Sequence, residues 1–246
     1  MESFAESSLF PKPAAPSVRI LRLQFDVVRA DMRIDVVQHS LKIWNHVDEF
    51  RVDPRLTALL ARNGVRMGVG SSGSKSPMRS ILSAARAKLH QQQYTVINGL
   101  PLMLRLESMA APETVFTYGS GGSLVGKTIP AGEKLLVLGY RTRPELSGAV
   151  DLHIGMEIRI DRGVLEWRTE GGVLHQVPGV DRHGFDELGV LLTLQPEEFL
   201  VIGPSEETAD AHLPLLGNRF FTGAGEGGRM ETVLFITPAV SRAATQ

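Results

Sequence analysis

The chain has 246 residues, 43% of them hydrophobic, which is enough for one large all-β domain or for two smaller domains. Its 26 Lys and Arg residues balance 27 Asp and Glu residues, so it lacks the basic surplus typical of nucleic-acid-binding proteins and of proteins that bind anionic membrane surfaces. It contains no cysteine, which excludes disulfides, thiolate metal sites and cysteine nucleophiles.

Residues 1–17 are rich in Pro, Ser and Ala, which predicts a flexible tail. This segment has no basic start followed by an apolar run, so it does not resemble a signal peptide. We therefore expect a cytoplasmic protein from the sequence as it stands. If the natural start lies upstream, or if a signal has been removed, we expect the bacterial cell envelope, in the periplasm or the outer membrane. No stretch approaches the roughly 18 uninterrupted apolar residues of a membrane helix.

Residues 18–93 predict a small α+β domain, because strand and helix patterns follow one another there. The best-marked helix has Asp53 as its N-cap and Pro54 in its first turn, and Gly64 ends it. The expected elements, in order, are a strand (18–27), a helix (36–50), a helix (54–63), a strand (65–69) and a helix (77–89).

Residues 94–242 predict a mainly antiparallel β domain, a sandwich or a curved sheet, because turn signals separate short strand patterns and no helix pattern follows residue 94. Asn98-Gly99 predicts a hairpin between strands at 94–97 and 102–106. The clearest strand covers residues 150–160, where six apolar side chains share one face. Further turns are expected at residues 161–163 and 171–172. The expected fold class is therefore α+β, with the small α+β domain at the N-terminal end.

The segment from Gly121 to Thr128 matches the phosphate-binding pattern G-x-x-x-x-G-K-[ST] letter for letter. That chemistry needs a helix that begins at the lysine, because the N-terminus of the helix supplies N–H groups to the phosphates. Here Pro130 and Gly132 follow closely, and a strand pattern begins at Glu133. We therefore favour a glycine-rich hairpin loop, and we keep nucleotide binding as a remote third hypothesis for the function.

The sequence offers no convergent catalytic or metal-binding set. The seven histidines are scattered and form no close ligand pair. The acidic region at 181–210 could supply a pair of hydrolytic carboxylates, but solvated loops explain it more simply. We therefore expect no enzyme activity, no cofactor and no metal site.

The C-terminal segment from Leu213 to Val240 carries the one family resemblance. A short apolar strand at 199–203 precedes a Pro-Leu-Leu-Gly turn, a glycine-rich loop and a final apolar strand that Pro238 ends. This order resembles the end of the secretin family, the ring-forming outer-membrane pores of type II and type III secretion and of type IV pili. The residues that carry the resemblance are Pro214, Leu215, Leu216, Gly217, Phe220, Glu231, Thr232, Leu234, Phe235, Ile236, Thr237 and Pro238. The resemblance implies a structural and assembly role for them.

Two hypotheses follow. In the first, the chain is a secretin-like cell-envelope protein, a structural subunit or accessory of a secretion or pilus assembly. Its partners would be further copies of itself or other envelope components, and membrane association would remain open. In the second, it is a soluble, non-enzymatic binding or structural module with a secretin-type β core and no pore. The run at 233–236 has no polar alternation, so both faces of that strand need cover in either case.

Overall fold

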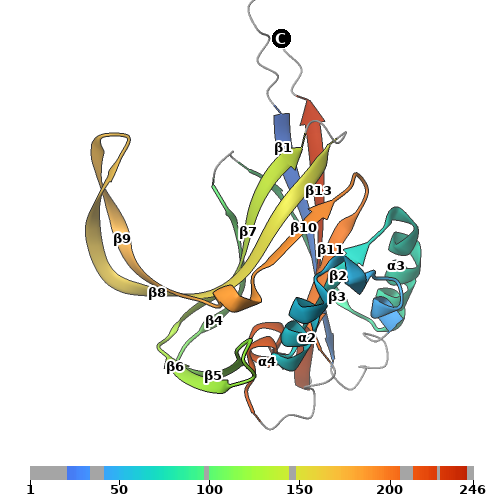
Figure 1. Cartoon of the computed structure of the whole chain (residues 1–246), viewed down its shortest axis with the longest axis horizontal. Helices are drawn as coiled ribbons and strands as arrows, with labels where there is room; N and C mark the ends of the chain where they lie inside the picture. The colour runs from blue at the N-terminus through green and yellow to red at the C-terminus, as the bar shows by residue number, and fades with distance from the viewer. Residues whose placement is uncertain are drawn as a thin grey trace, which may run out of the picture.

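The computed structural model describes residues 21–33, 42–96, 100–143, 148–205, 213–225 and 228–242. These residues form three antiparallel sheets with a few short helices (Figure 1). The strands are β1 (Leu21–Arg33), β2 (Val65–Gly70), β3 (Lys88–Thr95), β4 (Leu102–Met109), β5 (Glu113–Tyr118), β6 (Leu124–Ile129), β7 (Gly132–Arg143), β8 (Ala149–Glu170), β9 (Val173–Gly184), β10 (Val190–Leu194), β11 (Phe199–Pro204), β12 (Thr222–Gly225) and β13 (Gly228–Arg242). The helices are α2 (Pro54–Arg62), α3 (Lys75–Ala84) and α4 (Leu216–Phe221), with 3-10 turns at Glu49–Arg51, Ser72–Ser74 and Asp186–Leu188.

Sheet A joins the two ends of the described chain. Its strand order is β2-β11-β13-β1-β3, and β12 pairs with β13. The pairing of β1 with β13 runs without a break from Leu21 opposite Arg242 to Arg33 opposite Met230. The first and last strands therefore lie side by side in the middle of one sheet (Figure 1).

This arrangement makes the expected α+β fold class wrong. The structure is mostly β, and it has no separate small helical unit at the N-terminal end among the described residues. The strands β1, β2 and β3 are instead built into the sheet that β11 and β13 complete. The sequence pattern of β1 predicts a strand correctly, but periodicity does not reveal a partner about 200 residues away.

Two of the expected helices also need correction. The helix expected at 36–50 falls partly on residues 34–41, which lie outside the described residues. Its remainder is a single helical turn at residues 42–44 and a 3-10 turn at Glu49–Arg51. The helix expected to reach Leu89 stops at Ala84, because Arg86 adopts a positive φ of 51° and the Ala87 N–H donates back to the Leu82 carbonyl. Leu89 belongs to β3.

The second sheet, sheet B, has the order β10-β8-β7-β4, and β9 pairs with the outer part of β8. The third, sheet C, is the β5–β6 hairpin. The hairpin expected around Asn98-Gly99 is wrong, because β3 pairs with β1 in sheet A whereas β4 pairs with β7 in sheet B. Residues 97–99 themselves lie outside the described residues. The strands before and after this segment belong to different sheets.

Two apolar cores lie on the two faces of sheet A, and β13 contributes to both. Leu234 and Ile236 pack into the larger core, which side chains of sheet B and of helices α2 and α4 complete. Val233 and Phe235 pack into a smaller core under α3. The expectation that both faces of this strand are covered is therefore confirmed, and the cover comes from within a single chain.

Candidate functional site

The residues with the secretin resemblance belong to α4, to the residues just before it, and to β13. Most of them are buried, and only Pro214, Thr237 and Pro238 are half-buried. The buried ones are Leu215, Leu216, Gly217, Phe220, Glu231, Thr232, Leu234, Phe235 and Ile236. Helix α4 packs beside β13, and most of these residues are placed as core residues.

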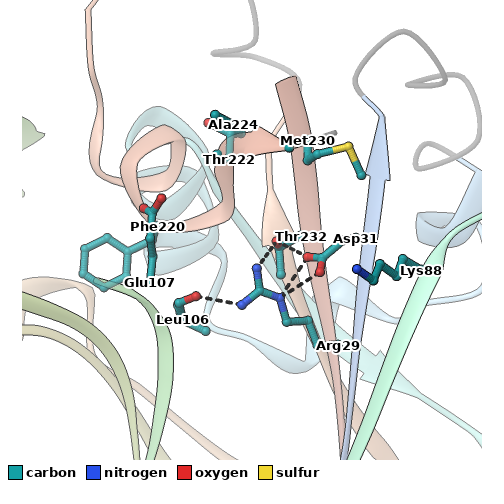
Figure 2. A pocket seen from close by; sticks show the side chains of 12 residues that line it. Arg29, Asp31, Lys88, Leu106, Glu107, Phe220, Thr222, Ala224, Met230 and Thr232 are labelled. Carbon is teal, nitrogen blue, oxygen red and sulfur yellow. Dashed lines mark hydrogen bonds and ion pairs between the residues drawn. The ribbon is translucent and has the colours of Figure 1, made fainter. Parts of the chain in front are cut away.

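A polar cavity of about 360 Å³ lies between β1, β12 and β13, next to Phe220 of α4 (Figure 2). Its central cation is Arg29, whose Nε donates to Asp31 at 2.8 Å and whose Nη1 donates to the Leu106 carbonyl at 2.7 Å. Thr232 donates its hydroxyl to the same carboxylate at 2.6 Å. Arg29 and Asp31 thus neutralise each other, so the cavity presents no strong uncompensated charge at its centre.

A second cavity, of about 640 Å³, is also lined by β12, and a buried lysine is part of its wall. Lys134 is only 2% exposed, and its Nζ lies 2.7 Å from Glu107 and 3.2 Å from Glu113. Arg219 on α4 approaches Glu113 at 3.5 Å. These four charges compensate one another and connect β4, β5, β7 and α4, which is a structural ion-pair network.

The segment from Gly121 to Thr128, which matches the phosphate-binding pattern, forms a hairpin turn and most of strand β6. Lys127 lies opposite Val115 in the β5–β6 pairing, and its Nζ is 3.0 Å from His183 Nδ1. The residues that follow Thr128 continue as β6 and then β7. The helix N-terminus that phosphate binding requires is therefore missing at this place.

Among the described residues, no group of three or more His, Asp and Glu side chains could hold a metal ion. The acidic region at 181–210 is dispersed: Glu198 pairs with Arg51 at 2.9 Å, and residues 206–212 lie outside the described residues. Burial raises the pKa of Glu198, but the hydrogen bonds from Arg51 and from the Gln195 N–H outweigh burial, so the net pKa is lowered. Glu198 is thus held as a carboxylate, which suits an ion pair.

The most conspicuous feature of the molecule is an arm formed by the outer part of β8 with β9 (Figure 1). We define the arm as residues 161–181. Near its root, β8 follows the expected alternation and buries five apolar side chains against the core. These are Val150, Leu152, Ile154, Met156 and Ile158. Pairing with β7 ends at Arg159, and beyond that point β9 is the only neighbour of β8 among the described strands.

The turn expected at residues 161–163 is wrong, because β8 continues through it. Residues 162–164 form a bulge opposite the single residue Gly179, and Gly163 has a positive φ of 67°. Arg162 secures the bulge with contacts of 2.7 Å to Asp181 across the ribbon and to Glu166 along it. The turn expected at residues 171–172 is confirmed, with φ of 58° and 81° at its two glycines.

One face of the arm is apolar and open to solvent. Residues directly opposite in an antiparallel pair share a face, and the pairs here are Leu165 with Pro178, Trp167 with Gln176 and Thr169 with Leu174. Leu165, Trp167 and Leu174 are 62%, 61% and 59% exposed. We call these three side chains the apolar face of the arm. A two-stranded ribbon is marginally stable alone in water, so an arm of this composition favours a partner.

Sequence reasoning missed this surface. The sequence does not show that β7 stops pairing with β8 before β8 ends, so it does not reveal that Trp167 is exposed. The available signal was the long run of strand residues on both sides of Gly171-Gly172.

Comparisons of the chain with protein-family models, with curated proteins and with solved structures found no match. Within the described ranges, no helix has the length and apolar character to cross a membrane.

Proposed function

We propose that the chain is a non-catalytic structural subunit that associates with further copies of itself through the arm. The carrying observation is the apolar face of the arm, in which Leu165, Trp167 and Leu174 are each more than half exposed on a two-stranded ribbon. Burial of such side chains stabilises association by about 25 cal/mol for each Å² removed from water. Tryptophan is also among the residue types that most often dominate interface energetics.

The polar cavities support a structural role more than a catalytic one. Their central charges pair with each other, as Arg29 does with Asp31 and Lys134 does with Glu107. A catalytic group generally needs an activating partner together with access to a substrate. Here the partners act mainly to hold strands together.

The wider context that we propose is a secretin-like assembly of the bacterial cell envelope, of the secretion or pilus type. Its support is the order of segments at the C-terminal end, where the strand β11 precedes the Pro-Leu-Leu-Gly segment and the final strand β13. The expectation of a turn without a helix after residue 94 is wrong at this place, because Leu216–Phe221 forms helix α4. One observation favours the alternative of a soluble module with this β core and no pore. The final strand β13 pairs on its two sides with β1 and β11 of the same chain.

The experiment is a concentration series by light scattering coupled to size-exclusion chromatography. We expect the wild type to form species larger than a monomer, and we expect Trp167→Glu to be monomeric. Leu191→Glu is the matched control, because Leu191 is a 76% exposed leucine on β10, outside the arm. A wild type that stays monomeric at high micromolar concentration would overturn the proposal. Negative-stain images of the larger species then separate a ring from a small closed oligomer.

A further inference from the structure

Sheet A is open along β3. This strand is the last in the strand order of the sheet, and among the described strands it pairs only with β1. Seven of its eight residues are exposed. Helix α3 packs over β1, β11 and β13 on one face, and a cavity of about 630 Å³ lies between β3 and β4 on the other. We call the side of β3 that faces away from β1 the β3 edge.

The register shows which backbone groups point out from the β3 edge. The Val96 N–H donates to the Leu23 carbonyl at 3.1 Å, so Val96 is one of the residues that bond to β1. In an antiparallel pair, such residues alternate with residues whose N–H and C=O groups point to the other side. The pairing of β1 with β3 runs without a shift, so the outward groups belong to alternate residues, which are Leu89, Gln91, Gln93 and Thr95.

Other strand edges of the molecule are protected against pairing, as is common in proteins. At the opposite end of sheet A, β2 is bridged by Asp48, whose N–H donates to the Val69 carbonyl at 2.8 Å. The outer strand β4 has a register shift between Arg105 and Glu107, and β9 contains Pro178. Strand β3 has an unbroken register, no proline, and a single lysine at its first residue. Its edge therefore keeps the geometry that a further strand needs.

A second copy of β3 fits this edge in one antiparallel register. Directly opposite residues in an antiparallel pair share a face, so a two-fold axis that passes at Gln92 places equivalent faces of the two copies on the same side. Gln91 of one copy then lies opposite Gln93 of the other, and Leu89 lies opposite Thr95. These are the residues with outward backbone groups, so every outward N–H and C=O group of both strands finds a partner.

The side chains of β3 are also compatible with themselves in this register. Lys88 of one copy lies opposite Val96 of the other, and His90 lies opposite Tyr94, so no like charges meet across the contact. Its remaining side chains are uncharged. The strand is thus self-complementary in backbone and in charge, which favours a second copy as the occupant of the edge.

We propose that two copies of the chain join their β3 edges about a two-fold axis at Gln92, so that their two copies of sheet A become one continuous sheet. Such an isologous contact closes on itself. Its hydrogen bonds replace bonds to water, so the contact alone is weak. The arm raises its population by holding copies at high local concentration. In this respect the inference rests on the proposed function, and it names a second contact surface and a symmetry axis of the assembly.

The chain contains no cysteine, so one introduced thiol can report the contact. Gln92 is exposed, and at the two-fold axis its Cα lies about 4.5 Å from that of its copy, within the range of a disulfide. We expect mild oxidation with diamide to link Gln92→Cys into dimers. The matched control is His90→Cys, which is exposed on the same face but lies about 14 Å from its copy. It should link about tenfold more slowly, or less.

A proline tests whether backbone pairing brings the two thiols together. The Gln93 N–H points away from β1, so Gln93→Pro removes an outward donor and leaves the pairing with β1 intact. Added to Gln92→Cys, it should slow the linking to the rate of His90→Cys. Gln93→Ala keeps the N–H group and should leave the linking rate of Gln92→Cys unchanged. Circular dichroism should report the same fold for every variant.

The outcomes separate this inference from the function on which it rests. If the wild type assembles in light scattering but Gln92→Cys links no faster than His90→Cys, the β3 contact is wrong and association through the arm stands. Fast linking that persists with Gln93→Pro would also overturn the β3 contact, because backbone pairing would not be its cause. If the wild type stays monomeric and Gln92→Cys still links faster than the control, the proposed function fails and the β3 contact stands.

Discussion

The side-chain amide of Asn63 pairs with the backbone of Tyr118 as a neighbouring strand would. Its Nδ2 donates to the Tyr118 carbonyl at 3.0 Å, and its Oδ1 accepts from the Tyr118 N–H at 2.8 Å. The same Nδ2 also donates to the Leu59 carbonyl at 2.9 Å, near the end of α2. Asn63 is fully buried, so one side chain fastens the β5–β6 hairpin to helix α2.

We expect Asn63→Ala to lower the free energy of unfolding by about 2–4 kcal/mol, because it leaves two or more buried polar groups without partners. Urea denaturation measures the change. Asn45→Ala is the matched control, since Asn45 is exposed, and should change stability by no more than about 0.5 kcal/mol. Equal urea midpoints for the two variants would contradict the structural role of Asn63.

Gly217 allows α4 to approach the backbone at the end of α2. A Cβ atom on Gly217 would lie 1.8 Å from the Gly64 carbonyl oxygen, and the Gly217 N–H donates to the Asn63 carbonyl at 2.8 Å. Alanine would gain about 1 kcal/mol of helix propensity, but the clash is with backbone that other bonds hold in place. We therefore expect Gly217→Ala to destabilise the fold by about 2 kcal/mol or more in thermal or urea unfolding.

Gly121→Ala is the control for this substitution. A Cβ atom on Gly121 meets nothing within 4 Å, and the residue is not among the glycines with positive φ. The change should be close to neutral. A neutral Gly217→Ala would mean that α4 can move away from Gly64 at little cost.

The buried charge of Lys134 gives a further prediction. Lys134→Met should destabilise the fold by about 2–4 kcal/mol, because the partly buried Glu113 and the more exposed Glu107 both lose the cation that lies nearest to them. Adding Glu107→Gln and Glu113→Gln to Lys134→Met should recover much of the loss in urea denaturation. Lys42→Met, at an exposed position, is the control. If the triple variant is no more stable than Lys134→Met, the loss of stability does not come from the unpaired carboxylates of Glu107 and Glu113.

Local features of the fold could be predicted where the signal is local. Asp53 caps α2 by accepting hydrogen bonds from the backbone N–H groups of Arg55 and Leu56, as its position before Pro54 predicted. The alternation of apolar and polar residues at 150–160 correctly predicted the first half of β8. Such alternation directly reflects the burial of one face of a strand.

Pairing partners and the ends of sheets could not be predicted in this way. Nothing in the residues of β1 points to β13, and a glycine such as Gly163 permits a bulge as readily as a turn. The exposure of Trp167 depends on where β7 stops pairing, which is a property of another strand. The arm is therefore a consequence of topology, which the residues of β8 and β9 alone do not reveal.

Asp151 ties the first residues of β8 to both neighbouring strands, and it makes stability depend on pH. The hydrogen bond from Thr193 Oγ1 on β10, 2.6 Å long, holds the pKa of Asp151 below its ordinary value; burial opposes this, and Arg143 on β7 adds to it. A lowered pKa in the folded state contributes stability that is fully present above the unfolded pKa of about 3.9. That contribution is lost as the pH falls through the folded pKa.

We therefore expect the free energy of unfolding to fall more steeply in the wild type than in Asp151→Asn as the pH is lowered from about 6 to about 3. Urea denaturation at several pH values measures both slopes. Other carboxylates such as Glu198 contribute to both proteins, so the difference between the slopes isolates Asp151. Thr193→Val removes the largest cause of the shift and should also flatten the dependence, although it leaves the carboxylate in place. Identical slopes in all three proteins would show that Asp151 is not stabilised by these contacts in solution.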